Sequence, residues 1–384
     1  MATRQLHVET LSAAQPKRTG DVPGDTWTCL RETGGTTVVL CDGQGHGIRA
    51  HVSATLCQSR LIGLLKAGYS LRRAVTSLAE SMEAARGRDP AYTAFCVLRI
   101  LNDGEAAVLS FDMPGAILLG PRHAAVLPTR TMAGGPPTVT EANCHLVPGE
   151  GVLLVTDGIT QAGLGCGLRD GWTIEGVAQS VDPFLSAGGE VARLPGRLLG
   201  ESLRLCGGKA GDDATVVAAV CRLGRTLSLF TGPPTDRTRD AVTVDRFLED
   251  AGWKVVCGGT TAAIVAQRLG RSVRVEQDPD SLVAPPRHYI DGIELVTEGA
   301  VTLNQVYNLM DTDPALFEEE SGVSELLRLF RAADRIHLFV GGSANPASAH
   351  ISFRQQGILS RQAILPLIVG KLRAAGKLVV EELV

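Results

Sequence analysis

Residues 36–50 read TTVVLCDGQGHGIRA, and three consecutive signals in this stretch decide how the chain folds. The apolar, β-branched run TTVVLC ends at Asp42, which is typical of a strand that reaches the edge of a sheet. Glycines at positions 43, 45 and 47 then allow a sharp turn. A helical pattern follows over residues 47–66. The stretch therefore predicts a strand, a tight turn and a helix, with a carboxylate at the turn.

The region from about Trp27 to Leu223 contains further strand-length runs, most of them bounded by Gly, Pro or Asp. These runs are TWTCLRE, TAFCVLRIL, EAAVLSFD, AAVLPT, GVLLVTD and ATVVAAVCRL. An Asp-Gly pair in the link LNDGEA predicts a tight hairpin, so at least part of the sheet is antiparallel. Further helices are expected at residues 71–86 and 191–206. The pattern predicts an α+β fold, in which helices flank an antiparallel sheet or sandwich.

The helix predicted for residues 47–66 carries large apolar side chains at helical spacing. They are Val52, Leu56, Leu61, Leu64 and Leu65. We expect this stripe to pack on one face of the sheet, because apolar side chains gain free energy when they leave water.

Beyond Leu223 the sequence changes to an alternation of strand, glycine-rich loop and helix. Strands are expected in TLSLFTGPP, WKVVCGGTT and RIHLFVGGSANP, and helices at Asp240–Ala251 and in AAIVAQRLG. Such alternation favours parallel strands joined by crossover helices. We place a boundary near residues 222–225, which gives a first domain at 1–223 and a smaller α/β domain at 224–384.

Composition excludes several classes of protein. The 384 residues carry a net charge of -4, from 37 basic and 41 acidic residues, without a basic block that would attract nucleic acid or an anionic membrane. The nine cysteines lie scattered, mostly in apolar runs, as expected of buried side chains in a reducing compartment. No apolar stretch approaches the roughly 18 residues of a membrane span, and the N-terminal segment lacks a secretory apolar core. These features predict a cytoplasmic protein that binds neither nucleic acid nor membrane.

Aspartates carry the candidate chemistry, and each lies where a predicted strand begins or ends. They are Asp25 in GDTW, Asp42 in CDGQGHG, Asp157 in VTDGI, and Asp212 and Asp213 in GDDATVV. A short carboxylate at a strand end is held rigidly, so several of them can converge on one point. Hard cations such as Mg²⁺ and Mn²⁺ prefer oxygen ligands of this kind. Turn chemistry explains each aspartate alone equally well, so it is the combination that indicates a metal centre.

The order of these motifs resembles a known family. GDTW, CDGQGHGIRA, VTDGI and GDDATVV are similar to the GD, DGxGxG, TDGI and DDxT motifs of the PPM (protein phosphatase 2C-like) family, in its bacterial sporulation stage II E branch. The resemblance covers about residues 20–223 and implies an antiparallel β-sandwich flanked by helices. It also implies a metal-dependent serine/threonine phosphatase that uses two Mn²⁺ or Mg²⁺ ions.

The resemblance further implies two cation sites that share one ligand. The ligands would be Asp42 as the bridge, Asp25 with the Gly43 carbonyl at one site, and Asp157 with Asp212 or Asp213 at the other. Asp42 and Asp157 are expected to be the central catalytic residues. Two adjacent cations lower the pKa of a bound water, which then attacks phosphorus without a covalent intermediate.

One position departs from the eukaryotic-type members of the family. In those members a His directly after the bridging Asp-Gly helps to protonate the leaving group, whereas this chain has Gln44. General acid catalysis by that route is therefore absent, as it is in sporulation-type relatives with Met there. His46, at the start of the predicted helix, is expected to cap or pack rather than to catalyse.

Predicted strands of the second domain are followed by small, flexible loops. The loop residues singled out are Gly258, Gly259, Thr260, Gly341, Gly342 and Ser343. Loops at the carboxyl ends of parallel strands lie where open α/β sheets bind ligands, and amides at a helix N-terminus favour an anion. Two interpretations stay open, a pocket for a small-molecule effector of the phosphatase and glycines that only allow strand-to-helix turns.

The sequence therefore predicts hydrolysis of phosphoserine or phosphothreonine in a protein partner, and the resemblance implies a signalling regulator as that partner. One alternative is a catalytically weak signalling or scaffold module with a ligand-sensing second domain. Another is a metal-dependent hydrolase of small phosphorylated metabolites. Retention of every candidate metal aspartate argues against the scaffold, because so much negative charge in one place is costly without cations.

Overall fold

The computed structural model describes residues 5–86, 92–132, 137–277, 285–313, 320–343 and 357–384. The chain forms two compact units, one at Gln5–Leu223 and one at Gly224–Val384. Helices in the described part of the chain are all too short or too polar to cross a lipid bilayer.

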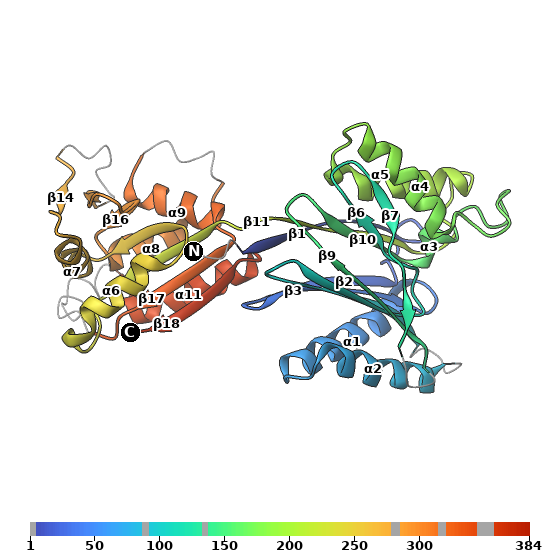
Figure 1. Ribbon diagram of the computed structural model, residues 1–384, viewed down its shortest axis with the longest axis horizontal. Helices are drawn as coiled ribbons and strands as arrows, with labels where there is room; N and C mark the ends of the chain where they lie inside the picture. Colours follow the sequence, from blue (N-terminus) through green and yellow to red (C-terminus); the bar gives the residue numbers. More distant parts are fainter. Residues whose placement is uncertain (1–4, 87–91, 133–136, 278–284, 314–319, 344–356) are drawn as a thin grey trace. The chain divides into compact units, whose positions relative to one another are not determined.

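The first unit is a sandwich of two antiparallel sheets (Figure 1). One sheet has the strand order β2-β3-β4-β5-β9-β8 and the other has the order β1-β11-β10-β6-β7. The strands of the first sheet are β2 (Asp25–Glu32), β3 (Gly35–Gly43), β4 (Thr93–Leu101), β5 (Glu105–Phe111), β8 (Arg130–Thr131) and β9 (Val139–His145). Those of the second are β1 (Leu6–Gln15), β6 (Ile117–Leu119), β7 (Ala124–Val126), β10 (Gly151–Val155) and β11 (Ala214–Leu223).

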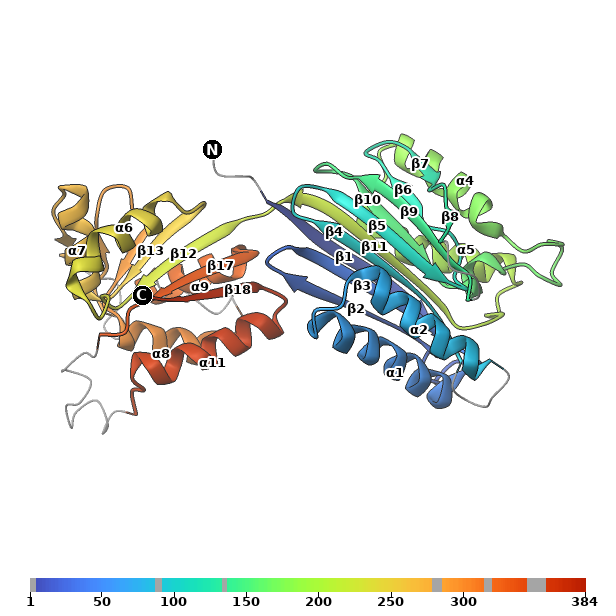
Figure 2. The same ribbon diagram turned by 60° about the horizontal axis from the view of Figure 1, so that its bottom comes forward.

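Helices cover both outer faces of the sandwich (Figure 2). They are α1 (Gly47–Lys66) and α2 (Leu71–Ala85) on the first sheet, α4 (Thr173–Ser186) and α5 (Leu194–Leu205) on the second, the short α3 (Asp157–Thr160) and a 3₁₀ turn (Val191–Arg193). Alternation along β3 builds the layers, since Val38 and Leu40 face the second sheet while Val39 and Cys41 face α1 and α2. The predicted α+β sandwich flanked by helices is confirmed.

The bounds predicted for α1 were right, but the prediction of its buried face was wrong in part. Leu61 and Leu65 are buried, whereas Val52 and Leu56 are 50% and 65% exposed. Small side chains occupy the buried stripe in the first half of the helix, and they are Ala50, Ser53, Ala54 and Cys57. Small residues let the helix approach the sheet closely, and the larger side chains then lie outside the contact.

Several elements of this unit were not predicted individually, and they are β1, β6, β8, β9, α3 and α4. β1 pairs along its full length with β11, from Leu6 opposite Leu223 to Gln15 opposite Ala214. Its sequence LHVETLSAAQ contains few β-branched or aromatic residues, so local propensity is a weak signal for this strand.

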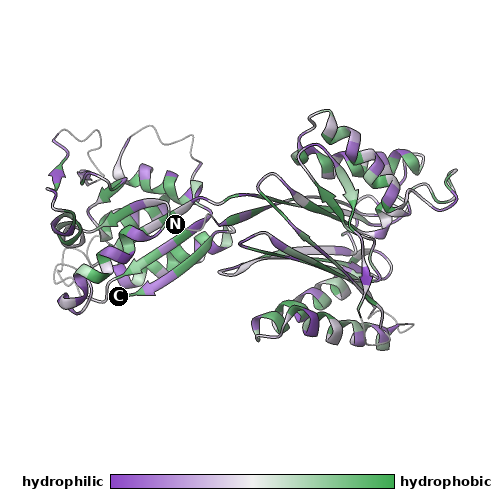
Figure 3. Cartoon of the chain, in the orientation of Figure 1, coloured by the Kyte–Doolittle hydropathy of each residue, from purple (hydrophilic) through white to green (hydrophobic). Residues whose placement is uncertain are grey.

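The second unit has one sheet with the strand order β14-β15-β16-β13-β12-β17-β18. The last five strands in this order are parallel, and the β14–β15 hairpin extends the sheet in antiparallel fashion. The bounds are β12 (Thr226–Thr231), β13 (Trp253–Cys257), β14 (Arg274–Val275), β15 (His288–Tyr289), β16 (Leu295–Thr297), β17 (Arg335–Val340) and β18 (Leu378–Leu383). Hydropathy colouring shows the largely apolar central strands (Figure 3).

Helices lie on both faces of this sheet as well. α6 (Asp240–Glu249) and α7 (Gly259–Leu269) pack on one face, and α8 (Ala300–Leu309), α9 (Gly322–Ala332) and α11 (Arg361–Ala374) pack on the other. A 3₁₀ turn (Arg237–Arg239) precedes α6. The alternation of strands and helices confirms the predicted α/β architecture with parallel strands, while α8, α9, α11 and β18 were not predicted individually.

Candidate metal centre

Asp25 and Asp42 are neighbours across the β2–β3 ladder. Asp25 is the first residue of β2, and the antiparallel register pairs it directly with Asp42 near the end of β3. Residues paired in this way have Cβ atoms about 4.5–5.5 Å apart. The strand pairing alone therefore brings two carboxylates together.

The turn after β3 requires glycine for two separate reasons. A Cβ atom on Gly43 would lie 2.1 Å from the Ala50 carbonyl oxygen, so the close approach of α1 excludes a side chain there. Gly45 and Gly47 have φ angles of 97° and 72°, which other residues rarely adopt. His46 is the exposed N-cap residue of α1, and its side chain makes no capping hydrogen bond.

The β10–α3 junction places Asp157 beside Asp213 of the GDDATVV motif. Asp157 is the first residue of α3, and a Cβ atom on Gly158 would lie 2.0 Å from the Asp213 carbonyl oxygen. This backbone contact keeps Asp157 next to the start of β11. Gln161, one turn further on, donates a hydrogen bond to Asp157 Oδ2 at 2.8 Å.

Asp212 and Asp213 have different surroundings. Asp213 is 4% exposed, and its two carboxylate oxygens accept hydrogen bonds from the backbone N–H groups of Lys17 (2.6 Å) and Gly24 (2.8 Å). The Asp212 side chain is 36% exposed and forms an ion pair with Lys17 Nζ at 3.4 Å. Asp213 thus holds the N-terminal segment in place, whereas Asp212 faces the open side of the cluster.

One carboxylate oxygen in the cluster is buried without a partner. Thr156 donates to Asp25 Oδ2 at 2.9 Å and accepts from the N–H of Thr215 at 2.9 Å. Asp25 Oδ1 is buried and has no hydrogen-bond partner. An unpaired buried carboxylate oxygen is costly, and a cation would remove that cost.

The carboxylates influence one another strongly. Burial, together with the charges of Asp25, Asp157 and Asp212, raises the pKa of Asp42 to about 10. Burial also raises the pKa of Asp25 to about 7, with the nearby Asp213 and Asp157 charges contributing. Burial also raises the pKa of Asp157. The cluster therefore retains protons when no cation neutralises it.

These aspartates supply an all-oxygen donor set of the kind that Mg²⁺ or Mn²⁺ prefers. Within the part of the chain that the structure describes, no three His, Cys, Asp or Glu side chains are already arranged to hold one metal ion. The Asp212 side chain turns toward Lys17. An exposed ion pair of that type is worth only about 0–1 kcal/mol, so Asp212 can rotate toward a cation at little cost. The chemistry of these oxygen donors fits a divalent cation.

Three side chains at this centre were not singled out from the sequence. They are Lys17, Thr156 and Gln161. Thr156 directly precedes Asp157 and Gln161 follows it by one helical turn. Their closeness to Asp157 in the sequence could have identified them as its neighbours. Lys17 lies 195 residues from Asp212, and only the pairing of β1 with β11 brings the two together.

The predicted loop at the end of β13 opens α7. Gly258 is the N-cap residue and has a φ of 125°, while Gly259 and Thr260 form the exposed start of the helix. The turn interpretation is sufficient for Gly258, because a positive φ favours glycine there. Exposure of the next two residues leaves the helix N-terminus accessible.

The predicted loop at the end of β17 packs against the loop after β12. A Cβ atom on Gly341 would lie 2.1 Å from the Pro233 carbonyl oxygen, and one on Gly342 would lie 2.4 Å from Thr235 Oγ1. The Ser343 N–H donates to the Pro233 carbonyl at 3.3 Å. Glycine is needed here because two loops approach closely.

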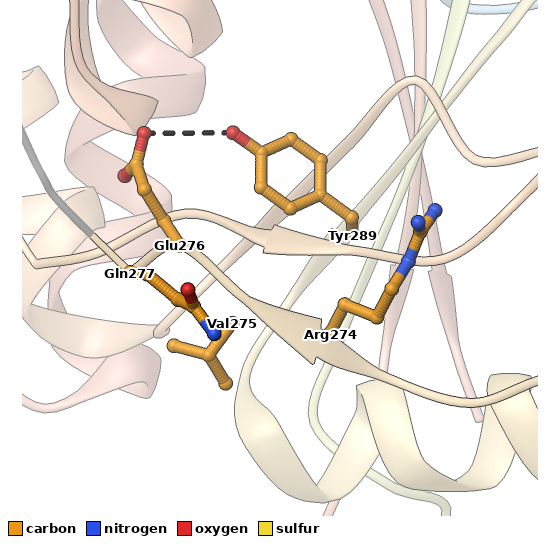
Figure 4. A pocket seen from close by; sticks show the side chains of 5 residues that line it. All are labelled: Arg274, Val275, Glu276, Gln277 and Tyr289. Atoms are coloured by element: carbon orange, nitrogen blue, oxygen red, sulfur yellow. Dashed lines mark hydrogen bonds between the residues drawn. The ribbon is translucent and has the colours of Figure 1, made fainter.

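A pocket of about 680 Å³ lies elsewhere in this unit, on the β14–β15 hairpin (Figure 4). It is lined by Arg274, Val275, Glu276, Gln277 and Tyr289. Its charged groups already have protein partners, since Arg274 pairs with Asp291 at 2.7 Å and Glu276 with Arg287 at 2.7 Å. The pocket shares no residue with the predicted loops.

Comparison with known proteins gives the following similarities. The family described as Stage II sporulation protein E (SpoIIE) matches residues 32–222. The structure of the PP2C phosphatase domain and a fragment of the regulatory domain of SpoIIE from Bacillus subtilis is 21% identical, with a TM-score of 0.48, over 57% of this chain and 65% of that chain. The RsbU and RsbW domains of a Mycobacterium tuberculosis protein are 19% identical over 64% of this chain and 69% of that chain, with a TM-score of 0.49. RsbX in complex with magnesium is 16% identical over 56% of this chain and 96% of that chain, with a TM-score of 0.41. No curated protein matches the chain.

Proposed function

Residues 32–222 belong to the SpoIIE family of PP2C-type phosphatase domains, and from this premise we propose that the chain hydrolyses phosphoserine or phosphothreonine in a protein partner. The observation that carries the proposal is the convergence of Asp25, Asp42 and Asp157, which come from separate strands or strand ends and share raised pKa values. Such a concentration of buried carboxylates at one edge of the sandwich is explained by cations.

We assign the first cation to Asp25, Asp42 and the Gly43 carbonyl, and the second to Asp42, Asp157 and Asp212. Asp25 Oδ1 supports this assignment, because it is buried and lacks a partner. Asp212 is preferred over Asp213, because both oxygens of Asp213 accept backbone hydrogen bonds. When bound, two Mg²⁺ or Mn²⁺ ions would supply a water of lowered pKa as the nucleophile for the phosphoryl group.

The protein's own residues position this chemistry. Thr156 orients Asp25 through a 2.9 Å hydrogen bond, and Gln161 orients Asp157. Lys17 lies beside Asp212 with an exposed ammonium group, which can attract a substrate phosphate once a cation takes over its carboxylate partner. Gln44 is exposed and carries no acid for the leaving group, so the proposed reaction relies on charge neutralisation and positioning.

Hydrolysis of an aryl phosphate by the full chain tests this proposal. We expect activity with Mn²⁺, loss of activity with EDTA, and a fall of at least about 100-fold in kcat for Asp42→Asn, the size of loss seen when an electrostatic contact to the reacting group is removed. Asp103→Asn is the matched control, because Asp103 only accepts a hydrogen bond from Glu105 N–H in the β4–β5 turn. Activity that survives chelation would contradict the metal mechanism.

A comparison of kcat/KM between phosphopeptides and small phosphorylated molecules tests the class of substrate. We expect phosphoserine and phosphothreonine peptides to be hydrolysed with higher kcat/KM than sugar phosphates or nucleotides. The reverse order would favour a hydrolase of small metabolites. Mn²⁺ binding by calorimetry without any turnover would favour a scaffold module.

A further inference from the structure

Strands of the second unit end together at one edge of the sheet. The parallel register pairs Thr231 at the end of β12 with Cys257 and with Val340, and it pairs Cys257 with Thr297. From β12 the chain moves to β13 and β16 on one side, whereas β17 and β18 lie on the other side. The strand order therefore reverses at the β12–β17 boundary, and open α/β sheets form a ligand crevice beyond the carboxyl ends of strands at such a point.

A half-buried arginine lies at this reversal point. Arg361, the first residue of α11, donates through Nη2 to the carbonyl oxygens of Gly341 (2.7 Å) and Ser343 (2.6 Å). A Cβ atom on Gly232 would lie 1.7 Å from Arg361 Nη1, so the guanidinium rests directly on the loop after β12. These contacts come from both sides of the reversal.

The charge of Arg361 is not neutralised by the protein around it. Among the residues that the structure describes, the ion pairs do not include Arg361, and its Nε atom is buried without a hydrogen-bond partner. Burial lowers the pKa of Arg361, which is the expected effect of desolvating a cation that lacks a carboxylate partner. Both Nη2 hydrogens are used by carbonyl groups, so Nε and Nη1 remain for an external acceptor.

A second unpartnered polar group lies at the start of α7. Thr261 is 1% exposed, and its hydroxyl oxygen is buried without a partner. The N-cap residue Gly258 has no side chain to bond the first-turn N–H groups, and Gly259 and Thr260 are exposed. An 11-residue helix with an uncapped, accessible N-terminus favours an anion there.

The strand register brings the two features to the same edge of the sheet, because Thr231, directly before Gly232, pairs with Cys257, directly before Gly258. The pKa of the Cys257 thiol is raised to about 12, mainly by burial, with the nearby Glu298 charge adding to the rise and the Arg361 charge opposing it. Arg361 is therefore close to the residue that directly precedes Gly258. Glu298, which lies exposed two residues before α8, adds one carboxylate near Cys257.

We propose that this crevice binds a small molecule through a phosphate group, held by Arg361, the Thr261 hydroxyl and the first-turn amides of α7. A guanidinium, a hydroxyl and helix amides supply donors from several directions, which suits a tetrahedral anion with several oxygens better than a planar carboxylate. Glu298 repels a second anionic group on its side and accepts a hydrogen bond from a ligand hydroxyl or amine. The ligand class is thus a phosphate monoester that carries hydroxyl or amino groups.

Isothermal titration of the full chain in EDTA tests this site, because chelation removes cation-dependent phosphate binding at the other unit. The probes are inorganic phosphate, AMP and acetate. We expect saturable binding of AMP, weaker binding of phosphate, and no binding of acetate up to about 10 mM, a concentration that detects even weak complexes. Arg361→Gln should weaken AMP binding by about ten-fold or more, as expected when a charged hydrogen bond is lost.

Two further variants separate recognition from folding. Thr261→Val keeps the shape of the side chain and removes only the hydroxyl, so we expect about a three-fold or greater loss of AMP affinity with unchanged circular dichroism. Arg328→Gln is the matched control, since Arg328 is a 57% exposed cation on α9. Absence of saturable AMP and phosphate binding, or binding that neither Arg361→Gln nor Thr261→Val weakens, would overturn the proposal.

Discussion

Asp212 and Asp213 are adjacent in sequence, yet they meet different partners. Asp213 accepts hydrogen bonds from two distant backbone N–H groups in a buried environment, while the half-exposed Asp212 side chain pairs with Lys17 and accepts a hydrogen bond only from the adjacent Asp213 N–H at 3.0 Å. We expect Asp213→Ala to lower the free energy of unfolding by about 2 kcal/mol or more, because it leaves the N–H groups of Lys17 and Gly24 unpaired. Chemical denaturation of the metal-free chain measures this change.

Asp212→Ala serves as the comparison for that variant. It should change the free energy of unfolding of the metal-free chain by less than about 1 kcal/mol, because its ion pair is exposed. It should nevertheless weaken Mn²⁺ binding in calorimetry. Equal stabilities of the two variants would show that Asp213 does not anchor the N-terminal segment.

The protonation of the aspartate cluster gives the metal-free protein a definite pH dependence. Burial raises the pKa of Asp25 to about 7 and that of Asp42 to about 10 in the folded chain. A carboxyl group with a raised pKa contributes stability that is complete below its unfolded pKa and is lost as the pH rises through the folded pKa. In EDTA the wild-type chain should therefore lose stability, relative to Asp42→Asn, as the pH rises from about 4, near the ordinary pKa of Asp, to about 10.

Thermal unfolding of both chains across this pH range checks the prediction. With saturating Mn²⁺ the trend should reverse for the wild type, because cation binding requires deprotonated carboxylates and releases their protons. Parallel pH profiles of the wild type and Asp42→Asn in EDTA would contradict the assignment of Asp42 as a protonated buried group.

At the scale of elements, α1 shows how small residues set the contact between a helix and a sheet. Leu61 is fully buried against β3 and α2, whereas Leu56 is 65% exposed on the same helix. Leu61→Ala should lower the free energy of unfolding by about 2–5 kcal/mol, the usual cost of a cavity in a packed core.

Leu56→Ala is the matched substitution for that test. It should change stability by less than about 0.5 kcal/mol, because it removes no buried contact. Denaturant titration of both variants gives the comparison. A loss of similar size in both would show that Leu56 is covered in solution.

Elements of the first unit differ in how well they could be predicted. In α1 and the β4–β5 hairpin, hydrophobic period and turn chemistry agree with the final structure, so local rules were sufficient. β1 contains Glu, Ser, Ala and Gln, and it is a strand because β11 offers it a complete hydrogen-bonding edge. Its assignment depended on a partner more than 200 residues away, which local propensity does not encode.

At the scale of the whole molecule, each unit has hydrophobic cores built only from its own residues. The core clusters of the first unit contain residues 8–221, and those of the second contain residues 227–384. We therefore propose that the boundary near Leu223 separates two domains that fold independently. A fragment of residues 1–223 should unfold cooperatively by calorimetry and retain Mn²⁺-dependent hydrolysis of an aryl phosphate. A fragment that stays unfolded would contradict the proposed boundary.

The sequence predicts those residues of the candidate site that lie at the ends of clearly recognisable strands. Asp25, Asp42 and Asp157 could be placed because each follows or precedes a strong strand pattern. The sequence could not show which partners Asp212 and Asp213 have. The two residues lie just before β11, outside a regular strand, so no alternation of side chains indicates which one points inward. Arg361 gave no signal, since a single arginine at a helix start is ordinary.

Sequence alone determined the order of strands, turns and carboxylates in the first unit, since hydrophobic period, turn glycines and motif spacing are properties of neighbouring residues. Tertiary structure decided which carboxylate stays buried without a partner, which aspartate holds the N-terminal segment, and which arginine reaches the strand ends of the second unit. The physical reason is that burial and pairing arise from contacts between residues far apart in the chain. Their free energies depend on the packed environment, which no local pattern specifies.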